Sequence, residues 1–158
     1  MTKIIITENQ NGCYHALPAS LIKEIAISSF AKYVSRIPYF AEWPKNLIEQ
    51  IVLLLVEEVY MPNDIVVEAS LSSDGLIIVD VGVLAVYPAS DDDVIYLIDG
   101  DYFGEISLVT TEVSATPSVV ALTASKVLFL DKLAFRRLMR GHPQLFFAMK
   151  EIINKINN

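Results

Sequence analysis

The sequence predicts a mainly β fold with flanking helices, built around an all-β barrel or a double-sheet roll. Up to Leu55 the apolar residues recur about every 3.6 positions, which is the spacing of an amphipathic helix. After Val56 they form short runs, separated by turn signals such as Pro62-Asn63-Asp64 and Asp99-Gly100. Helical spacing returns at Leu133. Several short strands with turns between them are typical of a barrel or roll.

Two helices are expected before the strands. The first opens at residues 17–20, with Ser20 as its N-cap, and ends before Pro38, because the residue before a proline avoids helical geometry. The second begins at Trp43-Pro44 and runs into the first strand. Residues 1–14 are polar and show no clear pattern, so we expect them to be loosely ordered.

Seven short runs are rich in β-branched or aromatic residues and are predicted as strands. They are residues 58–61, 65–68, 76–81, 83–87, 94–98, 118–124 and 127–130. Two further helices follow, over 133–140 and 144–156, with Gly141 and Pro143 between them. We expect Phe146-Phe147 to pack the last helix against the strands.

The charge of the chain limits its partners. The 158 residues carry a net charge of −7, and between Asn46 and Ser125 there are fourteen Asp and Glu but no Lys or Arg. Binding to nucleic acid or to an anionic membrane depends on Lys and Arg, so neither partner is expected. Cys13 is the single cysteine, which excludes a disulfide within the chain and fits a reducing compartment. No apolar run approaches the ~18 residues of a membrane span.

Neither catalysis nor metal binding is predicted. His15 and His142 have no ligand partners near them, and the three adjacent carboxylates Asp91-Asp92-Asp93 cannot converge on one ion from a strand link. The chain also lacks a phosphate-binding Walker loop and a dinucleotide fingerprint. We therefore expect no enzyme activity, no metal and no resident cofactor.

The most informative stretch is the loop from Asp99 to Leu108. It places a glycine turn and one carboxylate, Gly104-Glu105, between two groups of strands. Such a turn suits a small polyhydroxylated ligand. Phe103 to Leu108 matches, without a gap, the phosphate-binding cassette Phe-Gly-Glu-Ile/Leu-x-Leu. With this motif in this order of elements, residues 37–158 resemble the cyclic nucleotide-binding domain family.

This resemblance implies an eight-stranded, jelly-roll-like β-roll with N-terminal helices and with C-terminal hinge and lid helices. It implies cyclic AMP or cyclic GMP as the possible ligand. Gly104 would permit close backbone approach, and the amides of Glu105, Ile106 and Ser107 would hold the cyclic phosphate. The Glu105 carboxylate would accept from the ribose 2′-hydroxyl, and Ile156 would lie near the purine.

One departure from the family pattern affects the phosphate. Aligning the strand that begins at Ser118 places Ala115 where the family has an arginine, and Thr116 at the following hydroxyl position. A charge-assisted hydrogen bond contributes ~1.5–3 kcal/mol, so its loss should weaken binding roughly ten- to several-hundred-fold. Thr116 either donates one neutral hydrogen bond to the ligand or only satisfies its own loop. The five cations of the C-terminal helices are expected to form a solvated face: Arg136, Arg137, Arg140, Lys150 and Lys155.

The residues before the β domain carry a second resemblance. Residues 15–21 and Ile37-Pro38-Tyr39-Phe40 resemble the junction between C-linker and binding domain in tetrameric cation channels of the hyperpolarisation-activated, cyclic nucleotide-gated and ether-à-go-go types. A sperm-type sodium/proton exchanger would have similar residues. This resemblance implies a linker segment over 1–36, a homotetramer formed through residues 15–35, and a soluble fragment at the cytoplasmic face of a membrane protein.

Two functions remain open from the sequence. The first is a regulatory domain that binds a cyclic nucleotide weakly or atypically and modulates gating of a channel or transporter. The second is a gating or interaction module of the same fold that binds no nucleotide. Gly104-Glu105 favours the first function, whereas Ala115 and the acidic β domain favour the second. The nucleotide, the parent protein and the direction of gating are not specified by the sequence.

Overall fold

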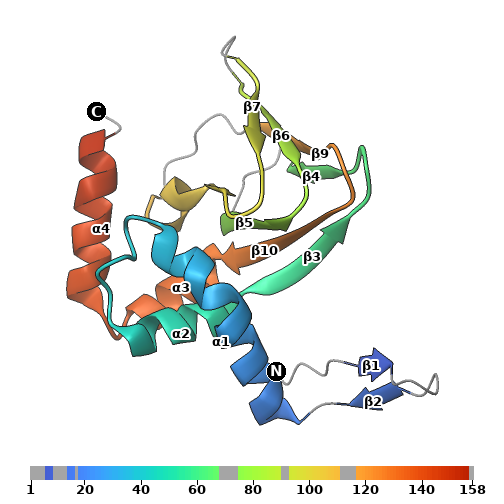
Figure 1. The fold of residues 1–158 in the computed structure, drawn as a ribbon. Coiled ribbons are helices and arrows are strands. Elements are labelled where there is room, and N and C mark those ends of the chain that lie inside the picture. Colours follow the sequence, from blue (N-terminus) through green and yellow to red (C-terminus); the bar gives the residue numbers. More distant parts are fainter. Residues whose placement is uncertain are drawn as a thin grey trace. The chain divides into compact units, whose positions relative to one another are not determined.

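The computed structural model describes residues 6–8, 14–16, 18–67, 75–89, 93–110 and 117–156 (Figure 1). The chain forms two compact units, Met1–Leu53 and Leu54–Asn158. None of the described helices is long and apolar enough to cross a membrane.

The first unit holds a short hairpin and two helices. Strand β1 (Ile6–Glu8) pairs antiparallel with β2 (Tyr14–Ala16), so the expectation that residues 1–14 are loosely ordered is wrong for Ile6–Glu8 and Tyr14. Three residues with weak alternation give too little pattern to predict a strand, and the pairing itself supplies the order. Helix α1 spans Ala19–Arg36, and α2 spans Lys45–Leu54 at the end of the unit.

The start of α1 differs from its prediction. The helix begins at Ala19 with Pro18 as N-cap, and no side chain caps it, so Ser20 is not the N-cap. Pro18 has an extended backbone (φ −56°, ψ 144°), and its carbonyl accepts from the Ile22 amide at 3.0 Å. The fixed φ of proline fits this extended N-cap backbone, and proline has no side-chain acceptor for the amides of the first turn. The predicted end is confirmed, since Ile37 is extended before Pro38.

The second unit is built on two four-stranded antiparallel sheets, which confirms the predicted eight-stranded β-roll (Figure 1). The first sheet has the order β3-β10-β5-β8, and its strands are Val56–Tyr60, Ser125–Asp131, Gly75–Val81 and Tyr102–Phe103. The second has the order β4-β9-β6-β7, and its strands are Ile65–Val67, Ser118–Ala121, Leu84–Tyr87 and Ile95–Leu97.

The interior of the roll is aliphatic. Its buried cluster takes alternate residues from both sheets: Ile77, Val79, Leu84, Val86, Leu97, Val119, Ala121 and Val127. The seven predicted strands are all present with small shifts of their ends. The eighth, β8, was not recognised because it has two residues, too few to show alternation.

Two helices follow the last strand. Helix α3 (Lys132–Met139) is capped by Asp131, whose Oδ2 accepts from the Ala134 amide at 3.0 Å. Helix α4 (Pro143–Ile156) stands beside the roll (Figure 1). The Phe146 ring lies 6.3 Å from that of Phe135 on α3, whereas Phe147 is exposed. The prediction that Phe147 packs α4 against the strands is therefore wrong.

Candidate ligand-binding site

The predicted cassette forms a left-handed glycine turn followed by one short helix. Gly104 has φ 93°, a region that favours glycine, and the 3₁₀ helix η1 (Glu105–Leu108) follows it directly. Leu108 is fully buried and fixes the end of η1 in the core. The side chain of Ser107 fixes the start, because its Oγ donates to the carbonyl oxygens of Gly104 at 2.6 Å and of Gly75 at 3.2 Å. The loop is thus attached to β5.

The amides of the cassette are not equivalent. The Ser107 amide donates to the Gly104 oxygen at 3.1 Å, so that it is already engaged inside the turn. The amides of Glu105 and Ile106 precede it at the start of η1. Of the three predicted phosphate donors, Ser107 thus donates within the turn, and the Glu105 amide donates to the carboxyl group of its own residue.

Glu105 lies in a half-buried position at the mouth of the same turn. Burial raises the pKa of its carboxyl group above the ordinary value, while backbone hydrogen bonds at Gly104 and at Glu105 act in the opposite direction. The carboxyl group is therefore held by the backbone beside the cassette and is partly removed from water. This is a suitable position for an acceptor of hydroxyl hydrogen bonds.

Arg136 on α3 contacts the other end of the cassette. Its Nε donates to the Leu108 oxygen at 3.1 Å, and its Nη2 donates to the Thr110 oxygen at 3.1 Å. These carbonyl groups lie at the C-terminal end of η1, where a cation is favoured and unpaired oxygens are common. The expectation of a solvated side chain is thus wrong for Arg136, which is half-buried. A signal was available in the sequence, because Arg136 directly follows Phe135, and Phe135 and Met139 are apolar residues four positions apart on one helix face.

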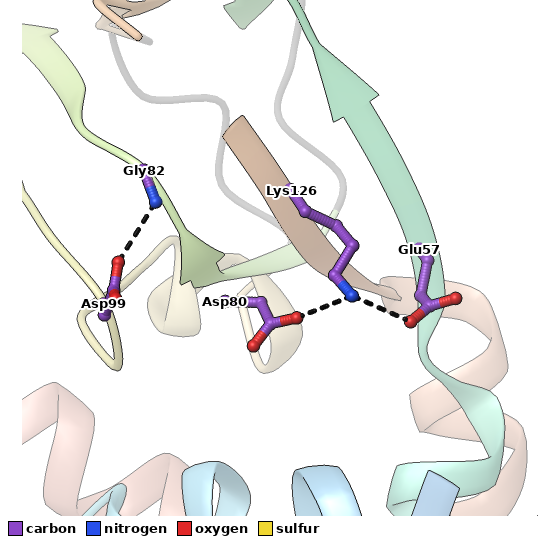
Figure 2. Close-up of polar contacts among 5 residues, drawn as sticks. All are labelled: Glu57, Asp80, Gly82, Asp99 and Lys126. Atoms are coloured by element: carbon purple, nitrogen blue, oxygen red, sulfur yellow. Dashed lines mark hydrogen bonds and ion pairs between the residues drawn. The ribbon is translucent and has the colours of Figure 1, made fainter. Parts of the chain in front are cut away.

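The framework under the cassette is held by backbone and ionic contacts. The Val79 amide donates to the Asp101 oxygen at 2.9 Å, and the Gly100 amide donates to the Val79 oxygen at 2.7 Å. Figure 2 shows the Gly82 amide donating to Asp99 Oδ1, at 3.0 Å. These bonds attach the turn that precedes β8 to strand β5.

A three-residue ionic cluster crosses the first sheet. Lys126 Nζ lies 2.9 Å from Asp80 Oδ2 and 3.6 Å from Glu57 Oε1, which links β10 to β5 and β3 (Figure 2). The hydrogen bond that Lys126 donates to Asp80, together with the charges of both carboxylates, raises the pKa of Lys126, whereas burial acts against this shift. Lys126 is the first cation of the sequence after Lys45, and its charge is directed to these carboxylates.

The structure brings four of the seven predicted site residues into one loop, Gly104 to Ser107. Ala115 and Thr116 lie outside the described residues. Ile156 is the last residue of α4, and its side chain is 66% exposed. Within the described ranges, no group of three or more His, Cys, Asp or Glu could hold a metal ion.

Comparison with known proteins now identifies the family. The family model described as "Cyclic nucleotide-binding domain" matches residues 57–142, which include β3 to α3 and the whole cassette. This chain belongs to the cyclic nucleotide-binding domain family. The match lies within the predicted domain of residues 37–158, and it covers the roll and the helix that carries Arg136.

Channel proteins from animals and plants are similar to this cyclic nucleotide-binding domain. Cyclic nucleotide-gated channel alpha-4 of Mus musculus is 29% identical over 94% of the chain and 28% of its own length. Potassium channel SKOR of Arabidopsis thaliana is 27% identical over 83% of the chain and 16% of its own length. The potassium/sodium hyperpolarization-activated cyclic nucleotide-gated channel 2 of Mus musculus is 27% identical over 86% of the chain and 16% of its own length. The chain thus spans between about a sixth and rather more than a quarter of these relatives, and two of the expected channel classes are confirmed as similar.

Proposed function

We propose that this chain is a regulatory domain of an ion channel or transporter and that it binds cyclic AMP or cyclic GMP weakly. The observation that carries this proposal is the left-handed turn at Gly104, with the start of η1 after it and the half-buried Glu105 carboxyl group beside it. Backbone amides in a turn of this kind can bind a single negative charge such as a cyclic phosphate. The carboxyl group beside them suits a ribose hydroxyl.

The weakness of binding follows from the proposed alignment of Ala115. No Lys or Arg occurs between Asn46 and Ser125, so the strands and loops of the roll, up to β9, supply no cation for the phosphate. The first cation after this stretch, Lys126, is paired with Asp80 and Glu57. The phosphate would be held by neutral donors in an acidic surrounding, with Thr116 as one further donor. We therefore expect an affinity roughly ten- to several-hundred-fold below that of a domain with the arginine.

Binding would be transmitted through the hinge helix. Arg136 attaches the end of the cassette to α3, and the Phe135 and Phe146 rings connect α3 to α4. A ligand that favours one position of the cassette would therefore favour one position of these helices, which is a shift of populations. Ile156, exposed at the end of α4, would be covered if the helix closes over the purine.

Titration calorimetry tests the proposal. Wild-type protein should bind cyclic AMP or cyclic GMP with a dissociation constant in the micromolar-to-millimolar range, about −8 to −4 kcal/mol. Ala115→Arg should tighten binding at least tenfold. Ala115→Gln is the matched control, because it adds comparable length without the charge and should leave the affinity within about threefold. Equal affinities of the Arg and Gln variants would contradict the alignment of this loop.

The second candidate function is a gating or interaction module that binds no nucleotide. The acidic roll and Ala115 favour it, since nothing in the sequence from 46 to 125 offsets the phosphate charge. No heat with either nucleotide at millimolar concentration, in wild type and in Ala115→Arg, would decide for this module. Both candidates are non-enzymatic.

We further propose that residues 1–36 form a linker segment and that residues 15–35 mediate a homotetramer at the cytoplasmic face of the parent membrane protein. The similarity to channels over 83–94% of the chain, which includes part or all of this segment, supports the proposal. Sedimentation equilibrium should detect tetramers at high protein concentration. Deletion of residues 15–35 should leave monomers, and a monomeric intact chain at high concentration would contradict the proposal.

A further inference from the structure

One row of residues on the outward face of the second sheet is apolar across all four of its strands. Ile65 on β4 pairs with Val120 on β9, Val120 pairs with Ala85 on β6, and Ala85 pairs with Tyr96 on β7. The residues on either side of Val120, Ala85 and Tyr96 along their strands include members of the buried interior cluster. Because side chains alternate along a strand, the row Ile65–Val120–Ala85–Tyr96 points away from that interior.

This row is open to solvent at both ends, whereas Ala85 in its middle is fully buried, and the row continues into a second one. Ile65 is 57% exposed and Tyr96 is 60% exposed. Ile98, which follows Tyr96 by two positions, is 56% exposed, and Leu122, which follows Val120 by two, is exposed as well. We call these six residues the outer face: Ile65, Ala85, Tyr96, Ile98, Val120 and Leu122. A sheet face directed to water normally carries polar side chains, so a contiguous apolar face marks an interaction surface.

The surroundings of the outer face are acidic. Asp64 precedes β4, Asp93 precedes β7 and Asp99 follows it, and all three are exposed. None of the four strands carries Lys or Arg, because no cation occurs between Asn46 and Ser125. Lysines commonly protect exposed edge strands against association, and β4 and β7, the edges of this sheet, lack them.

We propose that the outer face docks a cationic amphipathic segment of a partner protein, with apolar side chains on the face and Lys or Arg against the surrounding carboxylates. A second copy bound through the same face would bring Asp64, Asp93 and Asp99 of both copies together, and an anionic membrane would be repelled. Four strands span roughly 14 Å, which a helix of about ten residues covers. This proposal is independent of nucleotide binding.

The probe is a fluorescein-labelled helical peptide of about ten to twelve residues, with leucines along one face and lysines on the opposite face. Its control has glutamate in place of every lysine. By fluorescence anisotropy at low salt, the lysine peptide should bind at least about tenfold more tightly than the glutamate peptide, and the difference should shrink at ~1 M salt. In wild-type protein, amide chemical shifts should change on β4, β6, β7 and β9. Shifts confined to α3 and α4, or equal binding of both peptides, would overturn the proposal.

Variants distinguish binding at the outer face from non-specific binding to other apolar side chains. Tyr96→Ser should weaken binding of the lysine peptide at least about tenfold, and Asp93→Lys should weaken it about threefold. The matched control is Leu133→Ser on α3, which removes an equally exposed apolar side chain from another surface and should leave binding unchanged. Equal losses in Tyr96→Ser and Leu133→Ser would contradict the proposal. So would dimers of the wild-type chain that Tyr96→Ser abolishes, since the occupant would then be a second copy.

Discussion

Replacing Arg136 tests whether the hinge helix fixes the cassette. Arg136→Gln removes a charged donor from the oxygens of Leu108 and Thr110, both at 3.1 Å. A hydrogen bond from a charged group contributes ~1.5–3 kcal/mol when it is buried, but this side chain is half-buried and water can replace part of each bond. We therefore expect a loss of about 2 kcal/mol in the free energy of unfolding, or roughly 4–8 °C in Tm.

The geometry of the side chain gives a sharper expectation. Nε and Nη2 of one guanidinium reach two oxygens together, whereas a lysine offers a single point charge. Arg136→Lys should recover no more than about 1 kcal/mol of the loss. Arg137→Gln is the matched control, because Arg137 is exposed on the same helix, and it should change stability by less than about 0.5 kcal/mol.

Urea unfolding measures the global effect, and amide hydrogen exchange measures the local one. In Arg136→Gln, protection should fall at Val109 and Thr110, whose amides both donate to the Ile106 oxygen at 3.2 Å, while β5 and β10 keep theirs. Complete rescue by Lys would refute the two-bond geometry. Equal stability and equal exchange in the Gln variants at 136 and 137 would refute the link between α3 and the cassette.

Three further substitutions test the framework and the site. Gly82→Ala should lower the free energy of unfolding by about 2–4 kcal/mol, because Gly82 has φ +116° and an added Cβ would lie 2.8 Å from the Ser125 Cα. Gly141→Ala is the control: the atom nearest to its added Cβ is 3.7 Å away, so urea unfolding should show almost no change. Lys126→Met should lower the free energy of unfolding by no more than about 1 kcal/mol, since this side chain is 38% exposed. The loss should shrink in ~1 M salt, and an undiminished loss would contradict an ionic origin. Glu105→Gln should raise stability at pH 7, because burial raises the folded-state pKa of this carboxyl group and its charged form therefore weakens folding as the pH rises. The gain should vanish as the pH falls toward the unfolded-state pKa. A gain that does not depend on pH would contradict this reasoning.

Much of the fold could be predicted because hydrophobic periodicity changes twice along the chain. The change at Val56 and the return near Leu133 agree with the start of β3 and of α3 within a residue. The pattern could not predict the strands that are too short to show alternation and that form only because they pair with another strand. Strand β8 has two residues and exists because Ile77 and Ile78 pair with it, and Ile6–Glu8 is ordered by its partner strand. Local propensity contains no information on such partners.

The candidate site was predictable to the extent that it is local in sequence. Gly104 to Ser107 are consecutive, so the motif alone indicated the turn that the structure contains. The contacts of Arg136 were missed because its acceptors lie 28 and 26 residues earlier, and an arginine on a short helix more often points to water. The engagement of the Ser107 amide within the turn was also missed, since the motif does not show which amides a 3₁₀ turn uses.

The distribution of charge connects the candidate site to the C-terminal helices. Residues 126–158 contain seven Lys and Arg against two Asp and Glu, whereas residues 46–125 contain none against fourteen. Within the second unit, any cation that approaches a phosphate at Gly104 must therefore come from after β9. Of these cations, Lys126 is paired on the first sheet and Arg136 already contacts the cassette. If the proposed binding occurs, its electrostatic part should depend on where α3 and α4 lie. Arg136→Gln should then weaken nucleotide binding more than Arg137→Gln does, although on the proposed alignment neither side chain takes the place of an arginine at position 115. Equal affinities would show that the helices contribute no charge to the site.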